Sequence, residues 1–234
     1  MTDLDALRAQ CPPPAVVPPA PDWIRVEGEL GMRLPRDYKE LVAAYGLGEF
    51  CGFLTLYQPG ALSEWVDLTG PMPMWLRGQL DEIPSAARRP WSPPCNAADL
   101  FAMGVTGNGD HLFWDTRPHD APDQWTVAVA ERVRAPWFTY NGTVTAFLVD
   151  VLGGTTRVPW FPPGLLDDGV AFTPSRLRSR VPVTGLTTRS SISTRAIRDW
   201  ARANGFELPD RGRVPLAIRE AWEAAHAGGS ADPV

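Results

Sequence analysis

The spacing of apolar residues predicts helices near the start of the chain, strands in its middle and one more helix after them. Residues 23–30 are predicted to form a short helix, and residues 35–45 a second one with apolar side chains at helical spacing. Pro35 suits the first position of that second helix and Gly46 its end. A third helix is predicted over residues 143–152, where Gly153 follows an apolar face. The two apolar faces comprise Tyr38, Leu41, Val42 and Tyr45, and Val144, Phe147, Leu148 and Val151.

Four apolar runs between these helices predict strands, at residues 53–57, 100–105, 111–115 and 125–130. The turn between the second and third runs contains Asn108-Gly109, which supplies the positive φ of a tight hairpin. The Pro-rich residues 61–97 are expected to be irregular with one helix around 62–68, and residues 157–174 to form a loop and a last edge strand. Helices, then strands, then a closing helix, without regular βαβ alternation, indicate an α+β fold around a mostly antiparallel sheet with flanking helices.

Proline content and composition divide the chain into five segments. Residues 1–21 are expected to be an extended lead-in, because the prolines from Pro12 to Pro21 favour the polyproline conformation and block helix formation. Residues 22–174 make the α+β domain. Residues 175–192, rich in Arg, Ser and Thr, are expected to be a flexible basic linker. A small two-helix module at 193–228 and a tail at 229–234 follow.

Charge is unevenly distributed along this acidic chain of net charge −5. Residues 175–234 hold ten Arg and six acidic residues, a net charge of +4, which leaves 12 basic and 21 acidic residues, a net charge of −9, for residues 1–174. An acidic body with a basic tail indicates that the tail meets a polyanion. Chance variation in surface charge is the alternative.

The residues capable of chemistry do not form a catalytic or metal-binding pattern. Cys11, Cys51 and Cys95 are far apart and lack CxxC spacing, so we expect reduced thiols. The doublet Asp110-His111 falls in a predicted turn and is interpreted as a surface pair, because no Ser, Cys or second His has a triad-like context. We therefore expect no enzymatic activity, no cofactor and no metal.

The N-terminus and the hydropathy of the chain bear on its location. The first residues are acidic and lack the apolar segment of a signal peptide. No apolar run approaches the length of a membrane span. A cytoplasmic protein without a membrane partner is expected.

The last fifth of the chain contains two predicted helices joined by an Arg-Gly-Arg loop. Ser193 or Thr194 can cap the first helix, which is expected to end at Gly205, and Pro215 suits the first position of the second. The apolar faces comprise Ile197, Trp200 and Ala201 in the first helix and Ile218, Ala221, Trp222 and Ala225 in the second. A basic stripe lies about 140° from the apolar face of the first helix and consists of Arg195, Arg198 and Arg202.

The loop residues Arg211, Gly212 and Arg213 suit a DNA minor groove. In an extended segment residues i and i+2 project to the same side, so both guanidinium groups can enter one groove, while Gly212 lets the backbone approach closely. Tracts of A·T pairs have a narrow minor groove that attracts Arg, and they lack the guanine amino group that would obstruct it. The pattern predicts binding to AT-rich double-stranded DNA, and thus a place at the nucleoid.

The N-terminal residues resemble the opening of SUKH-superfamily domains, which are related to cell-wall-synthesis regulators and bacterial toxin-immunity proteins. The resemblance covers roughly residues 22–173. It rests on two motifs, Trp23-(x)3-Glu27-(x)2-Leu30-Gly31-(x)2-Leu34-Pro35-(x)-Asp37-Tyr38 with its continuation to Phe50, and Gly104-Val105-Thr106-(x)-Asn108-Gly109-Asp110-(x)-Leu112-Phe113-Trp114. It implies a domain that binds another protein and does no chemistry.

Residues 193–227 resemble the C-terminal DNA-binding domain of actinobacterial histone-like nucleoid-structuring silencers. The pattern I-R-x-W-A-x-x-N-G, then R-G-R-[IV]-P, then a short helix is present with its spacing intact. The resemblance implies that Arg211, Gly212 and Arg213 enter the minor groove, with the first helix near the phosphates. Asp210 departs from the pattern, and the oligomerisation domain of those silencers is replaced by the SUKH-like body, so filament formation is not implied.

Three interpretations follow. The protein is a nucleoid-associated protein or transcriptional regulator whose body binds a protein partner. Alternatively, it is an immunity or defence protein that neutralises a toxin and uses its tail for localisation. In the third, structural interpretation the basic tail packs on the acidic body, where Arg211 and Arg213 pair with carboxylates, and the tail is thereby autoinhibited. The partner's identity, the DNA target sites and the oligomeric state are left open.

Overall fold

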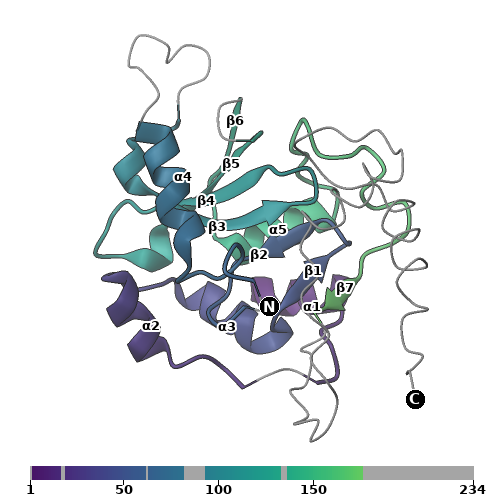
Figure 1. Ribbon diagram of the computed structural model, residues 1–234. Helices are drawn as coiled ribbons and strands as arrows, with labels where there is room; N and C mark the ends of the chain where they lie inside the picture. The colour runs from purple at the N-terminus through teal and green to yellow at the C-terminus, as the bar shows by residue number, and fades with distance from the viewer. Residues whose placement is uncertain (1, 17–18, 62, 82–92, 133–135, 176–234) are drawn as a thin grey trace, which may run out of the picture. The chain divides into compact units, whose positions relative to one another are not determined.

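The computed structural model describes residues 2–16, 19–61, 63–81, 93–132 and 136–175, all of which belong to the first of two units into which the chain divides, Met1–Arg178. Figure 1 shows helices on either side of a twisted sheet. The two-helix module predicted at 193–228, with the rest of the linker before it, lies outside the described residues.

Five α-helices are described: α1 (Asp3–Gln10), α2 (Trp23–Leu30), α3 (Arg36–Tyr45), α4 (Pro71–Asp81) and α5 (Val144–Leu152). The predicted helices at 23–30, 35–45 and 143–152 are confirmed as α2, α3 and α5. Pro35 is the residue before α3, and Gly46 ends that helix. Thr143 caps α5 by accepting a hydrogen bond from the Ala146 amide, which satisfies one of its free amides.

Seven strands and two short 3-10 helices complete the described structure: β1 (Gly48–Phe50), β2 (Leu54–Leu56), η2 (Ala97–Asp99), β3 (Leu100–Thr106), β4 (His111–Asp115), η3 (Pro122–Gln124), β5 (Thr126–Ala130), β6 (Trp137–Tyr140) and β7 (Phe172–Pro174). The four predicted strands are confirmed as β2 to β5. The hairpin between β3 and β4 turns through Gly109 at a φ of 83°. The predicted last edge strand is β7, while β1 and β6 were not predicted.

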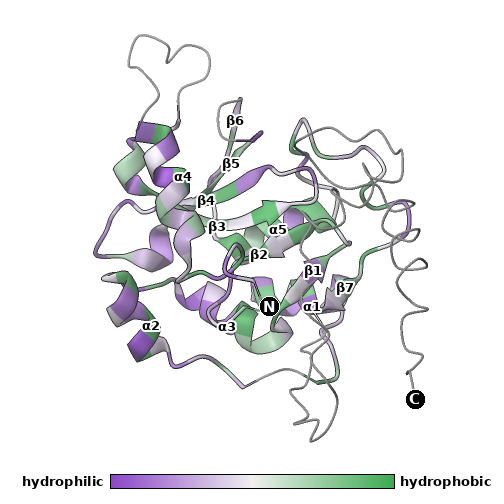
Figure 2. Ribbon diagram, in the orientation of Figure 1, coloured by the Kyte–Doolittle hydropathy of each residue, from purple (hydrophilic) through white to green (hydrophobic). Residues whose placement is uncertain are grey.

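The strands form one sheet in the order β6-β5-β4-β3-β2-β1-β7, and every neighbouring pair is antiparallel. Most residues of β3, β4 and β5 are buried on both faces of the sheet. In Figure 1, α4 lies on one side of these strands and α5 on the other. Figure 2 shows that α5 is mainly hydrophobic, as its buried residues require. The fold class predicted from the sequence, α+β with flanking helices, is thus confirmed for the N-terminal domain.

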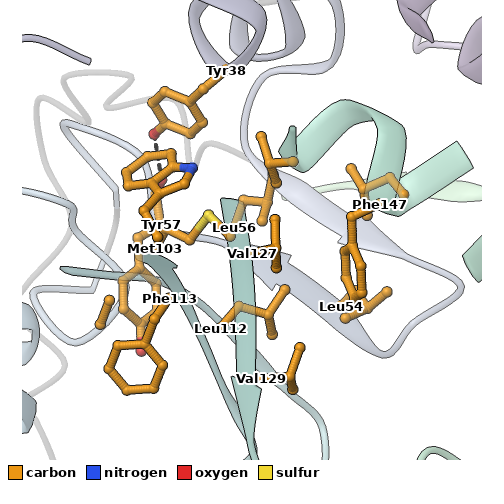
Figure 3. Close-up of a cluster of buried hydrophobic side chains, with 14 of the residues drawn as sticks. Tyr38, Leu54, Leu56, Tyr57, Met103, Leu112, Phe113, Val127, Val129 and Phe147 are labelled. Atoms are coloured by element: carbon orange, nitrogen blue, oxygen red, sulfur yellow. Dashed lines mark hydrogen bonds between the residues drawn. The ribbon is translucent and has the colours of Figure 1, made fainter. Parts of the chain in front are cut away.

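The core lies where α3 and α5 meet the central strands. Figure 3 shows apolar side chains from these elements converging, with Tyr38 of α3 and Phe147 of α5 at two sides of the cluster. The Tyr38 hydroxyl donates a hydrogen bond to the carbonyl oxygen of Tyr57, so this buried polar atom is satisfied. Asp37 links the two helices, since its Oδ2 accepts hydrogen bonds of 3.0 Å from both the amide and the hydroxyl of Thr145.

The expectation of an extended lead-in over residues 1–21 is wrong for its first half, where α1 forms. The side chains of Thr2 and Asp5 each accept a hydrogen bond from the other's backbone amide, which satisfies two free amides at the helix start. The prolines begin only after the helix has ended at Cys11. Leu7 is fully buried, and the Tyr45 hydroxyl donates to the Cys11 carbonyl oxygen at 2.6 Å, so α1 is part of the domain.

The helix expected around residues 62–68 is also misplaced, because the helix in this Pro-rich segment is α4. Asp67 holds a turn instead, with its carboxylate accepting hydrogen bonds from the amides of Gly60 and Thr69. Pro71 and Pro73 fall in the first turn of α4, where a missing amide hydrogen costs no helical hydrogen bond. Burial of Leu76 and Leu80 then stabilises a helix that propensity alone disfavours.

Candidate functional site

The doublet Asp110-His111 is buried, which corrects its interpretation as a surface pair. Asp110 is 2% exposed and accepts a 2.8 Å hydrogen bond from the Thr106 hydroxyl, while its own amide donates to that hydroxyl oxygen. Burial raises the pKa of Asp110. Burial also lowers the pKa of His111 to about 4, so the imidazole is neutral near pH 7. Asp110 therefore stabilises the β3–β4 turn, whereas the Nδ1 atom of His111 is buried without a hydrogen-bond partner.

A second group of ionisable side chains lies at the end of β4, and no pattern in the sequence predicted it. Arg117 binds Asp115 through two hydrogen bonds of 2.9 and 2.7 Å. His119 Nε2 lies 3.2 Å from Asp99 Oδ1, and its Nδ1 lies 3.5 Å from the Thr116 hydroxyl. That hydroxyl donates to the Asp99 carbonyl oxygen at 2.9 Å, so its proton does not point to His119. These hydrogen bonds connect η2 to the end of β4. They do not activate the Thr116 hydroxyl as a nucleophile, because no base accepts its proton.

Replacing Arg117 by alanine is expected to raise the pKa of Asp115. The hydrogen bonds from Arg117 are the main reason why this pKa lies below its ordinary value of 3.8. A carboxyl group with a depressed pKa stabilises the fold above its unfolded-state pKa, and this stabilisation is lost as the pH falls through the folded-state value. Carbon-13 NMR titration of the Asp115 carboxyl group would measure the pKa directly, with Arg25→Ala as a control for an exposed ion pair elsewhere. An unchanged pKa of Asp115 in the Arg117→Ala variant would show that Arg117 is not the main cause of its low value.

Two hollows on the described domain are small. One of about 190 Å³ is lined mainly by apolar residues of 151–166, and Arg157 is also among its lining residues. The other, of about 220 Å³, includes Arg25 and Gln58. Both are below the roughly 300–1,000 Å³ typical of small-molecule sites. Within the described ranges no cluster of three metal-ligating side chains occurs, and the three cysteines are free.

The described surface carries a concentration of exposed apolar side chains beside and on α4. Trp65, Met74 and Trp75 are 53%, 61% and 50% exposed. The carbonyl oxygen of Glu64 lies close to Gly70, which places the neighbouring Trp65 near the start of α4. Trp is enriched at protein interfaces, and exposed apolar patches mark interaction sites. Three large apolar side chains in and just before α4 are thus left exposed on the described domain. Among the described helices, none combines the length and the hydrophobicity needed to cross a bilayer.

The residues predicted to contact DNA, Arg195, Arg198, Arg202, Arg211, Gly212 and Arg213, lie outside the described residues. Their assignment rests on the sequence. The described domain holds several of its own cations in ion pairs, namely Arg25 with Glu29, Arg36 with Glu40, Lys39 with Glu27 and Arg117 with Asp115.

Comparison with known protein families finds two matches that divide the chain. The Lsr2 DNA-binding domain matches residues 189–225, which include the Arg-Gly-Arg loop. The SMI1-KNR4 cell-wall family, of the SUKH type, matches residues 21–142, just over half of the chain and most of the described sheet. No solved structure matches the chain. The chain therefore belongs to the SMI1-KNR4 (SUKH) family and carries in addition an Lsr2-type DNA-binding domain near its C-terminus.

Proposed function

We propose that this DNA-binding protein inserts Arg211 and Arg213 into the minor groove of AT-rich DNA while its SUKH domain binds a protein partner. Its role would be that of a nucleoid-associated protein or transcriptional regulator. The observation that carries the proposal is the Arg211-Gly212-Arg213 triplet inside the segment that matches the Lsr2 DNA-binding domain. Arg195, Arg198 and Arg202 would contact phosphates from the helix before the loop.

The charge distribution supports the assignment of DNA contact to the tail. Residues 1–174 carry a net charge of −9, and DNA phosphates repel such a body. Four of the body's cations are paired with its own carboxylates, which further weakens any attraction. The part of the chain that attracts DNA phosphates is therefore residues 175–234, which carry a net charge of +4.

A binding role, rather than catalysis, is the second part of the proposal. The ionisable groups that the described fold brings together have structural partners: Asp110 binds Thr106, and Asp115 binds Arg117. The two described hollows are small, whereas the surface beside α4 presents two half-exposed Trp side chains. Such a surface suits protein–protein contact better than binding of a small substrate.

Toxin neutralisation is the second candidate function, and membership of the SUKH family favours it. In that case the SUKH domain would bind a toxin, and the DNA-binding domain would localise the complex. Capture of partners with residues 1–174 distinguishes the two. Recovery of a toxin whose activity the protein blocks would favour immunity, and recovery of transcription or nucleoid proteins would favour regulation.

The full chain is expected to bind an AT-rich duplex more tightly than a GC-rich duplex of the same length. For a single module of this size the dissociation constant is expected to be about 10⁻⁴–10⁻⁶ M at physiological salt. Neutralisation of about four to five phosphates predicts a slope of roughly −3 to −5 for log K against log salt concentration. Fluorescence anisotropy with both duplexes would measure these quantities. Equal affinities would exclude groove insertion as the source of binding.

A further inference from the structure

The segment between α5 and β7 (Figure 1) builds a preformed hollow beside the end of α5. Val158 and Phe161 are buried and hold the segment against the domain, and the Phe161 ring packs edge-on against Phe53 at 5.1 Å between centroids. The amides of Phe161 and Leu165 each donate a hydrogen bond to the carbonyl oxygen three residues earlier, which fixes two turns. Prolines within residues 159–163 restrict the backbone further. The walls of the hollow are therefore in place before a ligand arrives.

The size and lining of this hollow suit one apolar side chain. Its volume is about 190 Å³, too little for a drug-sized ligand. The apolar part of its wall includes Val151, Phe161, Leu165 and Leu166. A side chain of the size of Val, Leu or Ile would leave water on entering it, which is favourable roughly in proportion to the apolar area buried.

Arg157 gives the hollow a positive charge. It is the one charged residue among those that line the hollow, and it is exposed. Within the part of the chain that the structure describes, no carboxylate lies within ion-pair distance of it. The second hollow differs, because its Arg25 is already bound to Glu29 at 2.6 Å. Charges farther away than about 8 Å are largely screened at physiological salt, so Arg157 has more influence on a ligand here than the net charge of the body.

We propose that this hollow binds the C-terminal residue of a protein partner, with its apolar side chain inside and its carboxylate on Arg157. In a terminal residue both groups branch from one Cα atom, so they can reach neighbouring parts of one small hollow. A carboxylate on the next side chain of an extended segment points to the opposite face. A guanidinium group binds a carboxylate through two parallel hydrogen bonds. Thr156, which also lines the hollow, can accept a hydrogen bond from the last amide of the partner.

This inference rests on the proposed role of the N-terminal domain in binding a protein, and it names the part of the partner that is recognised. DNA binding is assigned to other residues, so loss of the Arg157 side chain leaves the affinity for either duplex unchanged. A failure of the inference is thereby distinguishable from a failure of the proposed function, since the anisotropy titrations and the capture of partners do not depend on it.

NMR titration of the full chain with short peptides is the test. Acetyl-Gly-Gly-Leu with a free carboxylate is expected to shift the amide signals of residues 154–166 with a dissociation constant on the order of 1 mM, because only about eight of its non-hydrogen atoms make contact. Its C-terminal amide should bind about fivefold more weakly, since the ion pair is missing. The free acid 3-methylbutanoate should bind about threefold more weakly than the peptide, because it lacks the amide that donates to Thr156.

Three variants assign the contacts. Arg157→Gln should bind the carboxylate and the amide forms of the peptide equally, whereas Arg25→Gln, which removes the same charge from the other hollow, should keep the fivefold difference. Leu166→Ala should weaken both forms by about threefold and also keep the difference, since it removes only apolar wall. Circular dichroism should show an unchanged fold for all three.

Several results would overturn the proposal. One is the absence of shifts in residues 154–166 at 20-fold the expected dissociation constant, about 20 mM. Another is equal affinity of the wild-type protein for the carboxylate and amide forms, or a difference that Arg157→Gln preserves. Binding of 3-methylbutanoate as tightly as the peptide would show that the hollow takes a free acid rather than the end of a protein chain.

Discussion

The double variant R211A/R213A is expected to lose its preference for AT-rich over GC-rich DNA and to bind the AT-rich duplex at least roughly 30-fold more weakly. Each Arg in a groove contributes about 1–3 kcal/mol, and a tenfold change in affinity corresponds to about 1.4 kcal/mol. The narrow groove of A·T tracts concentrates negative potential, so these contacts contribute most on AT-rich DNA. The affinity for the GC-rich duplex should fall only by the loss of general charge attraction.

Anisotropy titrations with both duplexes at one salt concentration would measure this effect. The matched control is R8A/R157A, which removes the same charge from exposed positions of the described N-terminal unit and should preserve the AT preference. Circular dichroism should show an unchanged fold for both double variants. If R211A/R213A lost affinity equally for both duplexes, the two arginines would contact phosphates rather than the groove floor.

Trp114→Ala is expected to destabilise the SUKH domain by about 3–5 kcal/mol, the usual cost of removing a large aromatic side chain from a core. Trp114 is 1% exposed. Its ring packs edge-on against Tyr38 at 5.0 Å between centroids and lies 6.0 Å from Trp125, so it joins α3 to the sheet. Such a loss is a large part of the about 5–15 kcal/mol that stabilises a typical domain.

Urea unfolding followed by circular dichroism would measure this loss. Trp65→Ala is the matched control, because the same side chain is removed from a position that is 53% exposed. Its expected effect is within about 0.5 kcal/mol, as for most surface substitutions. Equal destabilisation by the two variants would show that Trp114 does not anchor the core.

The sequence was sufficient to predict those helices and strands in which the spacing of apolar residues agrees with the residues that typically end such an element. The helix α3 shows a clear apolar face and ends at Gly46, and the β3–β4 hairpin has Asn108-Gly109 at its turn. In both cases the residues that form the element are close in the chain. Short edge elements lack such signals. Strand β1 has three residues, and its pairing with β7 depends on residues more than 120 positions away, such as Phe172 opposite Phe50.

Prolines led to a wrong structural prediction at two places for the same physical reason. A proline prevents a helix only where a backbone amide is needed inside it. In α1 the prolines come after the end, and in α4 they occupy the first turn, where the amides have no helical partner. Whether these helices form is decided by burial of residues such as Leu7 and Leu76 against the rest of the domain. Composition does not contain that information.

The sequence by itself determined the family, the α+β class and the assignment of DNA binding to the C-terminal region, because these follow from local spacing, motifs and the distribution of charge. Only the tertiary structure decided that Asp110 and His111 are buried, that α1 belongs to the domain and that α4 turns an apolar face outward. The physical reason is that burial depends on what distant segments cover. A pattern along the chain can show that a helix has apolar residues on two sides, but only packing decides which of those sides remains in water.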